Sequence, residues 1–183
     1  LGVTGAITAL LKDAILPNLV QTLEGCPAII HGGPFANIAH GCNSIVATKT
    51  AMQFGEYVIT EAGFASDLGA EKFFNIKCRK AGLQPAMSVL VATSQALKLS
   101  GGISEDKMML PDSVALTEGL KNMEKHIAIL KSFKQKVLVV LNRYHFDSDG
   151  EIDLMRKWCS SKDVSFAVND AFRKGGEGGM EMA

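Results

Sequence analysis

The chain has 183 residues, of which 47% are hydrophobic and 18 are glycine, and this length and composition are typical of a globular α/β domain with a sizeable core. Basic and acidic residues number 19 each, which argues against a nucleic-acid or acidic-membrane partner. No apolar run is long enough to span a bilayer, and no signal peptide is visible. The four cysteines are scattered without a CxxC pair, so we expect reduced thiols, a cytoplasmic location and no disulfide or zinc site.

The first half of the chain alternates between helical and strand-like patterns. Apolar residues recur at helical spacing from residue 5 until Pro17 disturbs the pattern. Glycines mark a turn over residues 61–69, and Gly82 follows a further helical stretch. The predicted elements of this half are a helix over residues 5–20, a strand over 27–31, a helix over 37–54, a strand over 57–60 and a helix over 72–81.

The second half continues the alternation: a strand over 88–93, a helix over 112–133, a strand over 137–141, a helix over 151–161 and a strand over 164–168. Strands alternating with helices, without hairpin signals, predict an α/β fold whose mostly parallel sheet has helices on both faces. Residues 88–93 and 137–141 are almost continuously apolar. We therefore expect them to be parallel neighbours or near-neighbours, buried on both faces.

Every unusual loop of the sequence follows a predicted strand. In a parallel sheet these five loops lie at one edge, where open α/β folds bind ligands. Glycines, carboxylates, imidazoles and aromatic rings in such loops suit a flat heterocycle and a phosphate better than a protein partner. The residues expected at this edge are His31, Asn37, His40, Glu61, Asp67, Asn142, Tyr144, Asp147, Phe172 and Lys174.

The first of these loops contains Gly32 and Gly33, which allow a ligand to approach the backbone, and the following helix start favours an anion. A tight loop that merely needs glycine is the alternative. His31 and His40 bracket the loop, and hydrogen bonds that pin it are as plausible a role for them as contact with a ligand.

The later loops leave similar alternatives open. Glu61 and Asp67 flank a glycine turn, where they either position a cation, a phosphate-bound metal or an amine, or cap the helix that starts near Ser66. Tyr144 and Phe172 directly follow predicted strands. On the residues alone, aromatic rings that cap the sheet are a more common explanation than a ligand clamp.

Five parts of the sequence resemble formate–tetrahydrofolate ligase (formyltetrahydrofolate synthetase), in the family's order from about residue 5 to the end. They are PNLVQTLE (17–24), HGGPFANIAHG (31–41), TEAGF (60–64) with DLGAEKF (67–73), KCR (77–79) and KGGEGG (174–179). VATSQALKLSGG (91–102) is similar to a second family signature, with Gln95 in place of the usual arginine and Ser100 in place of histidine or asparagine.

The resemblance implies a ligase of one-carbon metabolism. Family enzymes convert formate, ATP-Mg and tetrahydrofolate into 10-formyltetrahydrofolate, ADP and phosphate through formyl phosphate. They use a monovalent cation and are typically homotetramers. The family's phosphate-binding GxGKT-type loop lies upstream of the stretch matched here, and the chain starts at Leu1. We therefore expect a middle-to-C-terminal part of a longer ligase, inactive when isolated.

The resemblance also implies roles for individual residues. Family members stack the pterin between two aromatic side chains, which correspond to Tyr144 and to Phe172, where tryptophan is common. The implied folate set is Asn142, Tyr144, Phe172 and Lys174; the catalytic set is His31, Asn37, His40, Glu61 and Asp67; the phosphate or formyl-phosphate loops contain Gly32, Gly33, Gly63 and Phe64. No residue is assigned to a metal.

The implied division places the nucleotide and formyl-phosphate side in residues 1–110 and the folate side in residues 111–183. Two other functions remain open. One is a domain that binds folate or phosphate without activity, which Gln95 and Ser100 support. The other is a subunit-assembly module that buries its long helix and Trp158 against another subunit.

Overall fold

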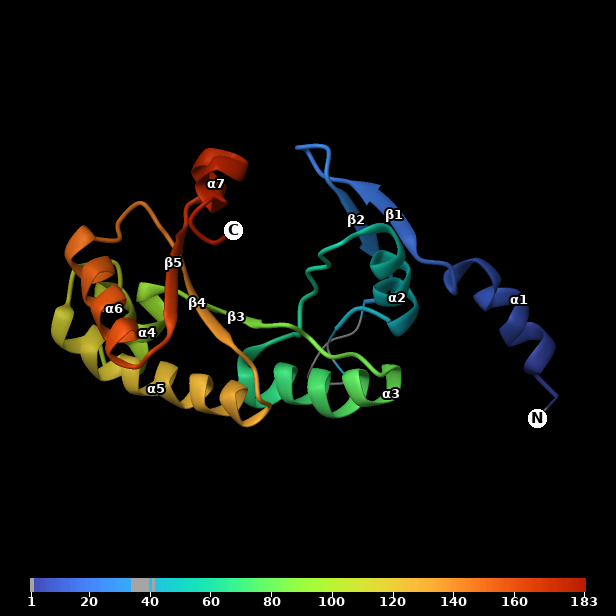
Figure 1. Ribbon diagram of the computed structural model, residues 1–183, viewed down its shortest axis with the longest axis horizontal. Helices are drawn as coiled ribbons and strands as arrows, with labels where there is room; N and C mark the ends of the chain where they lie inside the picture. Colours follow the sequence, from blue (N-terminus) through green and yellow to red (C-terminus); the bar gives the residue numbers. More distant parts are fainter. Residues whose placement is uncertain (1, 34–39, 41) are drawn as a thin grey trace. The chain divides into compact units, whose positions relative to one another are not determined.

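The computed structural model describes residues 2–33, 40 and 42–183 (Figure 1). The chain forms two compact units, Leu1–Gln84 and Pro85–Ala183, and each is described by itself. Both combine helices with strands, so the α/β class is confirmed. Within the described ranges, no helix is long and apolar enough to cross a membrane. The predicted functional division after residue 110 concerns ligands and remains a prediction.

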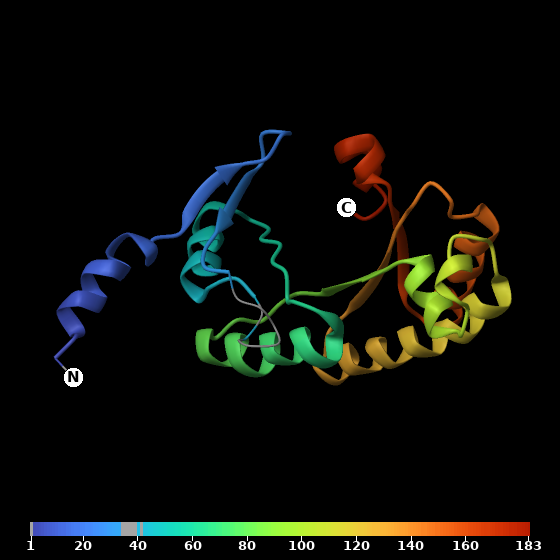
Figure 2. The same cartoon turned by 180° about the vertical axis from the view of Figure 1, so that it is seen from behind.

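The first unit contains a β-hairpin, which Figures 1 and 2 show from opposite sides. Its elements are α1 (Thr4–Ala14), β1 (Asn18–Gln21), β2 (Pro27–Ile30), α2 (Ile45–Phe54), π-helical segments at Ala65–Ala70 and Phe73–Cys78, and α3 (Arg79–Ala81). β1 and β2 pair antiparallel, with Asn18 opposite Ile30. The predicted helix over 5–20 is therefore wrong beyond α1, because Pro17 disfavours helix and leaves the next residues free to pair.

Two other expectations for this unit are corrected. Residues 57–60 are not in a strand, so neither predicted strand of this half belongs to a parallel sheet. α2 begins at Ile45 rather than near residue 37, because the Ser44 hydroxyl accepts the Ala47 N–H and caps the helix there. Residues 37–39 lie outside the described part of the chain. The helix expected over residues 72–81 is present, mostly as the second π-helical segment.

The second unit is built on a three-stranded parallel sheet, in the order β3-β4-β5. Its elements are β3 (Ser88–Ala92), α4 (Ser94–Ser100), a 3-10 turn at Glu105–Lys107, α5 (Ser113–Ser132), β4 (Val137–Asn142), α6 (Asp149–Ser161), β5 (Ser165–Asn169), α7 (Ala171–Lys174) and a 3-10 segment at Gly175–Gly179. The prediction that the strands near residues 88 and 137 are parallel neighbours is confirmed, with Leu90 opposite Val139.

One face of this sheet packs against the helices. Leu90, Val139 and Phe166 share that face and belong to the main core with residues of α4, α5 and α6. On the other face Val89 and Val91 are 44% and 61% exposed. The expected burial of β3 on both faces is therefore wrong. The strand order advances in one direction, and right-handed crossovers then leave their helices on one face.

Helices α4 and α5 cross closely because glycines lie at the crossing. A Cβ atom on Gly119 would lie 1.8 Å from the Leu97 carbonyl oxygen, and one on Gly101 would lie 1.8 Å from that of Ala115. These distances are far below van der Waals contact, so larger residues at either position would force the helices apart. α4 follows β3 directly in the chain, so its first turn lies at the end of the sheet where the strands finish.

A buried ion pair joins α4 to α6. Lys98 Nζ lies 3.1 Å from Glu151 Oε1 and donates to the Leu110 carbonyl oxygen at 2.8 Å. Glu151 also accepts the Asp112 N–H at 3.0 Å and the Ser148 hydroxyl at 2.9 Å. Burial by itself would raise the pKa of Glu151. These hydrogen bonds and Lys98 outweigh it, and the pKa lies below its usual value.

Replacing Lys98 tests this pair. Lys98→Met leaves the Glu151 carboxylate buried without its cation, and we expect the free energy of unfolding to fall by about 3–5 kcal/mol. Lys121→Met is the control, because Lys121 pairs with Glu118 on the exposed surface of α5, and such pairs contribute about 0–1 kcal/mol. Urea unfolding followed by circular dichroism measures both, and equal losses would contradict the account.

Candidate functional site

The loops at the ends of β3, β4 and β5 lie at one edge of the second unit's sheet, called the carboxyl edge below. Asp147 joins two of these loops. Its carboxylate accepts the hydroxyl of Ser94, the first residue of α4, and the backbone N–H of Tyr144 at 2.8 Å. Because Asp147 is buried, these bonds hold the loop after β4 against the start of α4 and determine the path of the backbone at Tyr144.

Two asparagines connect the ends of β4 and β5. Asn142 and Asn169 are partners in the strand register, and the Asn169 side-chain amide donates to the Asn142 side-chain oxygen at 3.4 Å. The Arg143 N–H donates to the Asn169 carbonyl oxygen at 2.9 Å. The predicted folate residues Tyr144 and Phe172 follow these two strand ends by two and three positions, so the fold brings both to the carboxyl edge.

The two predicted clamp residues differ in their surroundings. The Tyr144 ring is 40% exposed and stacks on Phe146, with 5.4 Å between centroids and 9° between planes. Phe172 lies in α7 and is 98% exposed. Sequence reasoning missed Phe146, whose only signal was its position two residues after Tyr144. The pairing of Tyr144 with Phe172 around a pterin remains a prediction.

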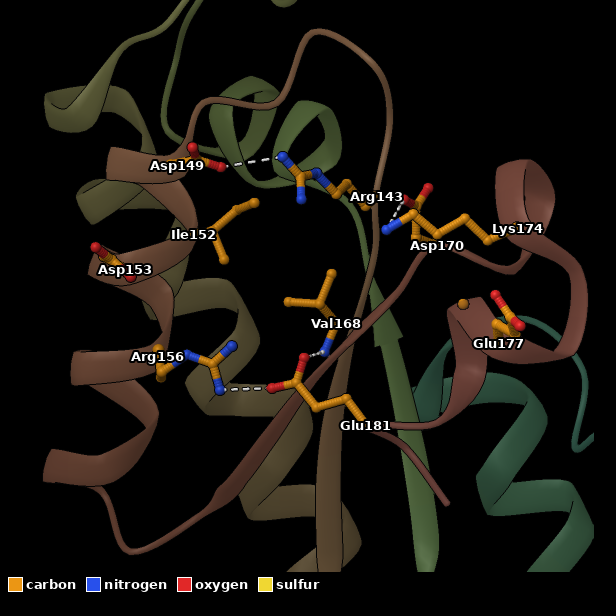
Figure 3. Close-up of a pocket in the computed structure, with 11 residues that line it drawn as sticks. Arg143, Asp149, Ile152, Asp153, Arg156, Val168, Asp170, Lys174, Glu177 and Glu181 are labelled. Atoms are coloured by element: carbon orange, nitrogen blue, oxygen red, sulfur yellow. Dashed lines mark hydrogen bonds and ion pairs between the residues drawn. The ribbon is translucent and has the colours of Figure 1, made fainter.

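A pocket of about 380 Å³ opens beside this edge. Figure 3 shows it between α6 on one side and β5 with the C-terminal segment on the other. Arg143 pairs with Asp149 at 3.0 Å, and Arg156 pairs with Glu181 at 2.7 Å. The charged residues that line the pocket are Arg143, Arg156 and Lys174 with Asp149, Asp153, Asp170, Glu177 and Glu181. Carboxylates outnumber cations, so the pocket favours proton donors over anions.

The glycine-rich run after Lys174 folds back on the end of β5. The Asp170 N–H donates to the Gly178 carbonyl oxygen at 2.9 Å, and a Cβ atom on Gly178 would lie 2.4 Å from the Asp170 carbonyl carbon and oxygen. Gly178 is therefore needed for close backbone packing, which sequence reasoning did not anticipate. Gly175 has φ of 59°, a conformation that glycine adopts without strain.

Alanine substitutions distinguish the glycine that packs closely, Gly178, from a neighbour that does not, Gly179. Gly178→Ala overpacks the contact with Asp170, and we expect it to lower the free energy of unfolding by about 1–3 kcal/mol. Gly179→Ala is the matched control, since nothing lies within 4 Å of its added methyl group, and its effect should be within about 0.5 kcal/mol. Thermal unfolding of the two variants measures the difference. A harmless Gly178→Ala would show that the contact is not needed.

In the first unit, hydrogen bonds hold His31 in place. Its backbone N–H donates to the Asn43 side-chain oxygen at 3.1 Å. Its ring Nδ1 lies 2.6 Å from the Ser44 hydroxyl, and its ring Nε2 lies 2.9 Å from the Ala14 carbonyl oxygen. The Asn43 amide donates to the Ile29 carbonyl oxygen at 2.8 Å. These contacts support the pinning role of His31. Asn43 was missed, and its position just before the helix-capping serine was the available signal.

The other predicted residues of this unit differ in their burial. His40 is half-buried, and its buried Nδ1 has no hydrogen-bond partner among the described residues. Asn37 lies outside the described residues. Gly32 has φ of 71° and Gly63 has φ of 82°, so both adopt the backbone conformation that favours glycine. The remaining members of the set are exposed: Gly33, Glu61, Gly63, Phe64 and Asp67.

A buried lysine lies in the second π-helical segment. Lys77 is 1% exposed, and its ammonium group has no hydrogen-bond partner in the described part of the chain. Burial lowers the pKa of Lys77, and nearby Cys42, Cys78 and Glu61 oppose this only in part. Burial also raises the pKa of both thiols. The only sequence signal for this group was the KCR stretch, to which no role was assigned.

The buried amine makes the stability of this unit depend on pH. Because the folded-state pKa of Lys77 lies below its ordinary value of 10.5, the unfolded chain binds more protons in the interval below that value. The contribution of Lys77 therefore makes stability rise with pH through this interval, whereas the raised pKa values of the Cys42 and Cys78 thiols act in the opposite direction. We expect Lys77→Met to raise the free energy of unfolding at pH 7, and the difference in stability between the variant and the unsubstituted chain to shrink as the pH rises, as measured by urea unfolding of both from pH 7 to 10.

Lys80→Met is the matched control, because Lys80 is an exposed neighbour of the same helical stretch. It should leave both the stability and its pH dependence nearly unchanged. A loss of stability in Lys77→Met at pH 7 would contradict this account, since it would mean that favourable interactions of the ammonium, such as its contact 5.3 Å from the centre of the Phe73 ring, outweigh the cost of its burial.

The fold and the carboxyl edge define a class of protein: an α/β segment whose loops gather at the ends of parallel strands. Comparison with known proteins specifies it further. The family described as formate--tetrahydrofolate ligase matches residues 1–183, and the chain belongs to this family, as its sequence motifs indicated.

Curated relatives named "Formate--tetrahydrofolate ligase" match the whole chain. Those of Bacteroides thetaiotaomicron and Parabacteroides distasonis are 61% identical over 183 residues, and that of Porphyromonas gingivalis is 57% identical over the same length. In each case the match covers 100% of this chain and 33% of the relative. The chain therefore spans about one third of the length of these relatives.

Proposed function

We propose that this chain supplies the folate side, and part of the nucleotide and formyl-phosphate side, of a formate–tetrahydrofolate ligase. The single observation that supports it most is the parallel pairing of β4 and β5. Asn142 and Asn169 end these strands side by side, and the residues matching the family's pterin clamp follow directly. Residues 111–183 would contain the folate side, and residues 1–110 would contribute to the nucleotide and formyl-phosphate side.

The proposed reaction has two steps. Formate attacks the γ-phosphorus of ATP, ADP leaves, and formyl phosphate forms. The secondary amine of tetrahydrofolate then attacks the formyl carbon, phosphate leaves, and the amine loses its proton to give 10-formyltetrahydrofolate. Catalysis of such steps consists mainly of positioning and charge stabilisation. Tyr144, Phe172, Asn142 and Lys174 would orient the folate in the second step.

The first unit would serve the phosphate-bearing intermediate. Its glycine positions, Gly32, Gly33 and Gly63, permit close approach of a ligand to the backbone. His31, Asn37, His40, Glu61, Asp67 and Phe64 complete the proposed set on this side. The chain contains no GxxxxGK[ST] loop, and we propose that by itself it does not form product.

The monovalent cation and the homotetramer implied by the family belong to the same proposal. Across the described residues, no group of three or more His, Cys, Asp or Glu side chains is placed to hold a metal ion. Formate, ATP-Mg and tetrahydrofolate are the proposed small-molecule substrates.

Substitution of Phe172 in a full-length ligase carrying this segment tests the clamp. Because Phe172 is almost fully exposed, its ring is available to a ligand and its loss should hardly change stability. We expect Phe172→Ala to raise the KM for tetrahydrofolate at a cost of about 1–3 kcal/mol, from lost stacking and apolar burial. The KM for ATP should change less. Initial rates with each substrate varied in turn measure both constants.

Phe172→Trp is the control, since tryptophan preserves the aromatic face and should be tolerated. An alanine variant that raised the KM for tetrahydrofolate and the KM for ATP equally would contradict the assignment of Phe172 to the folate side.

A further inference from the structure

One buried carboxylate of the second unit has no hydrogen-bond donor. Asp170 directly follows β5 and is 6% exposed, and neither oxygen of its carboxylate has a hydrogen-bond partner among the described residues. Lys174 Nζ lies 3.5 Å away and Arg173 Nη1 lies 3.8 Å away, which is too far for good hydrogen bonds. Both cations belong to side chains that are more than half exposed.

Such an arrangement is costly unless something compensates for it. Buried polar groups nearly always have hydrogen-bond partners, and a buried carboxylate that accepts no hydrogen bond is among the most unfavourable exceptions. The backbone holds Asp170 in position. Its backbone N–H donates to the Gly178 carbonyl oxygen, and its carbonyl oxygen accepts the backbone N–H groups of Arg173 and Lys174 at 3.1 Å each. The carboxylate therefore stays at the pocket even though no protein group in the described part of the chain completes it.

A complementary unpaired donor lies in the same pocket. Arg143 Nε is buried and has no partner in the described ranges, although the guanidinium end of this side chain pairs with Asp149. Asp170 and Arg143 both line the pocket, and Figure 3 shows them at the same end of it. Two acceptors, the carboxylate oxygens of Asp170, and one donor, Arg143 Nε, thus make no hydrogen bond with the described residues at this end of the pocket.

This combination matches the edge of one class of ligand. A 2-amino-4-oxopyrimidine ring presents an amino group, a ring N–H and a carbonyl oxygen in sequence. A carboxylate can accept the two adjacent donors in a bidentate arrangement, and a guanidinium N–H can donate to the carbonyl. The excess of carboxylates in the pocket also favours proton donors, and its volume of about 380 Å³ suits a small heterocycle.

We propose that Asp170 is a specificity-determining residue that accepts the 2-amino and N3–H groups of the pterin ring, while Arg143 Nε donates to its 4-oxo group. This inference rests on the proposed folate function and adds to it the residues that recognise the edge of the ring. The long ion pairs of the exposed Arg173 and Lys174 side chains with Asp170 can open at small cost when the ring enters.

The test compares pterin with lumazine, in which an oxo group replaces the 2-amino group. Titration of the 183-residue chain by calorimetry should show pterin binding roughly 10- to 100-fold more tightly, the range expected for a hydrogen bond to a charged acceptor. Asp170→Asn offers one acceptor and one donor, which match the N3–H and 2-oxo groups of lumazine. In this variant the preference should disappear or reverse.

Asp106→Asn is the control, because Asp106 is an exposed carboxylate of the same unit that does not line this pocket, and its loss should leave the preference for pterin unchanged. Equal binding of pterin and lumazine to the unsubstituted chain would overturn the inference, even if Asp170→Asn failed to fold. An unchanged preference in a folded Asp170→Asn would overturn it as well.

The Phe172→Ala variant distinguishes this failure from failure of the folate assignment. If Phe172→Ala weakens the binding of both heterocycles while the unsubstituted chain prefers neither, the assignment of Phe172 to the clamp is supported and the proposed role of Asp170 is wrong. If the unsubstituted chain binds neither heterocycle, both the inference and the proposed folate function of this chain are overturned.

Discussion

The candidate site depends on the parallel register of β4 and β5. That register places Asn142 opposite Asn169, and everything attributed to the folate side follows within a few residues of these two positions. A shift by one residue would turn each following side chain to the opposite face of the sheet. The packed face of β4, with Val139 and Leu141 fully buried against the helices, makes such a shift unfavourable because it would expose the core.

Polar contacts then hold the loops that leave this register. Asp147 connects the loop after β4 to α4, and the buried pair of Lys98 with Glu151 connects α4 to α6. Gly178 packs on the backbone of Asp170. These contacts use most of the buried polar groups near the carboxyl edge for structure. Asp170 and Arg143 Nε stand out for that reason, since their buried atoms are held in place and yet have no hydrogen-bond partners in the described residues.

Much of the second unit could be predicted from sequence, whereas the strand pairing of the first unit could not. Continuous apolar runs with amphipathic helices between them have few alternatives to a parallel sheet, and β3 and β4 pair as expected. The hairpin of β1 and β2 was missed because its apolar residues extend a helical pattern, and only Pro17 opposes it. Contacts such as Asn43 with His31 or Gly178 with Asp170 arise from tertiary packing, which spacing along the chain does not reveal.

We propose that the ends of β4 and β5 form the pterin site. A crystal structure of a full-length ligase carrying this segment, with tetrahydrofolate bound, tests it most directly. The account predicts a pterin ring stacked between Tyr144 and Phe172, with its aminopyrimidine edge on the Asp170 carboxylate. A pterin bound away from the ends of these two strands would contradict it.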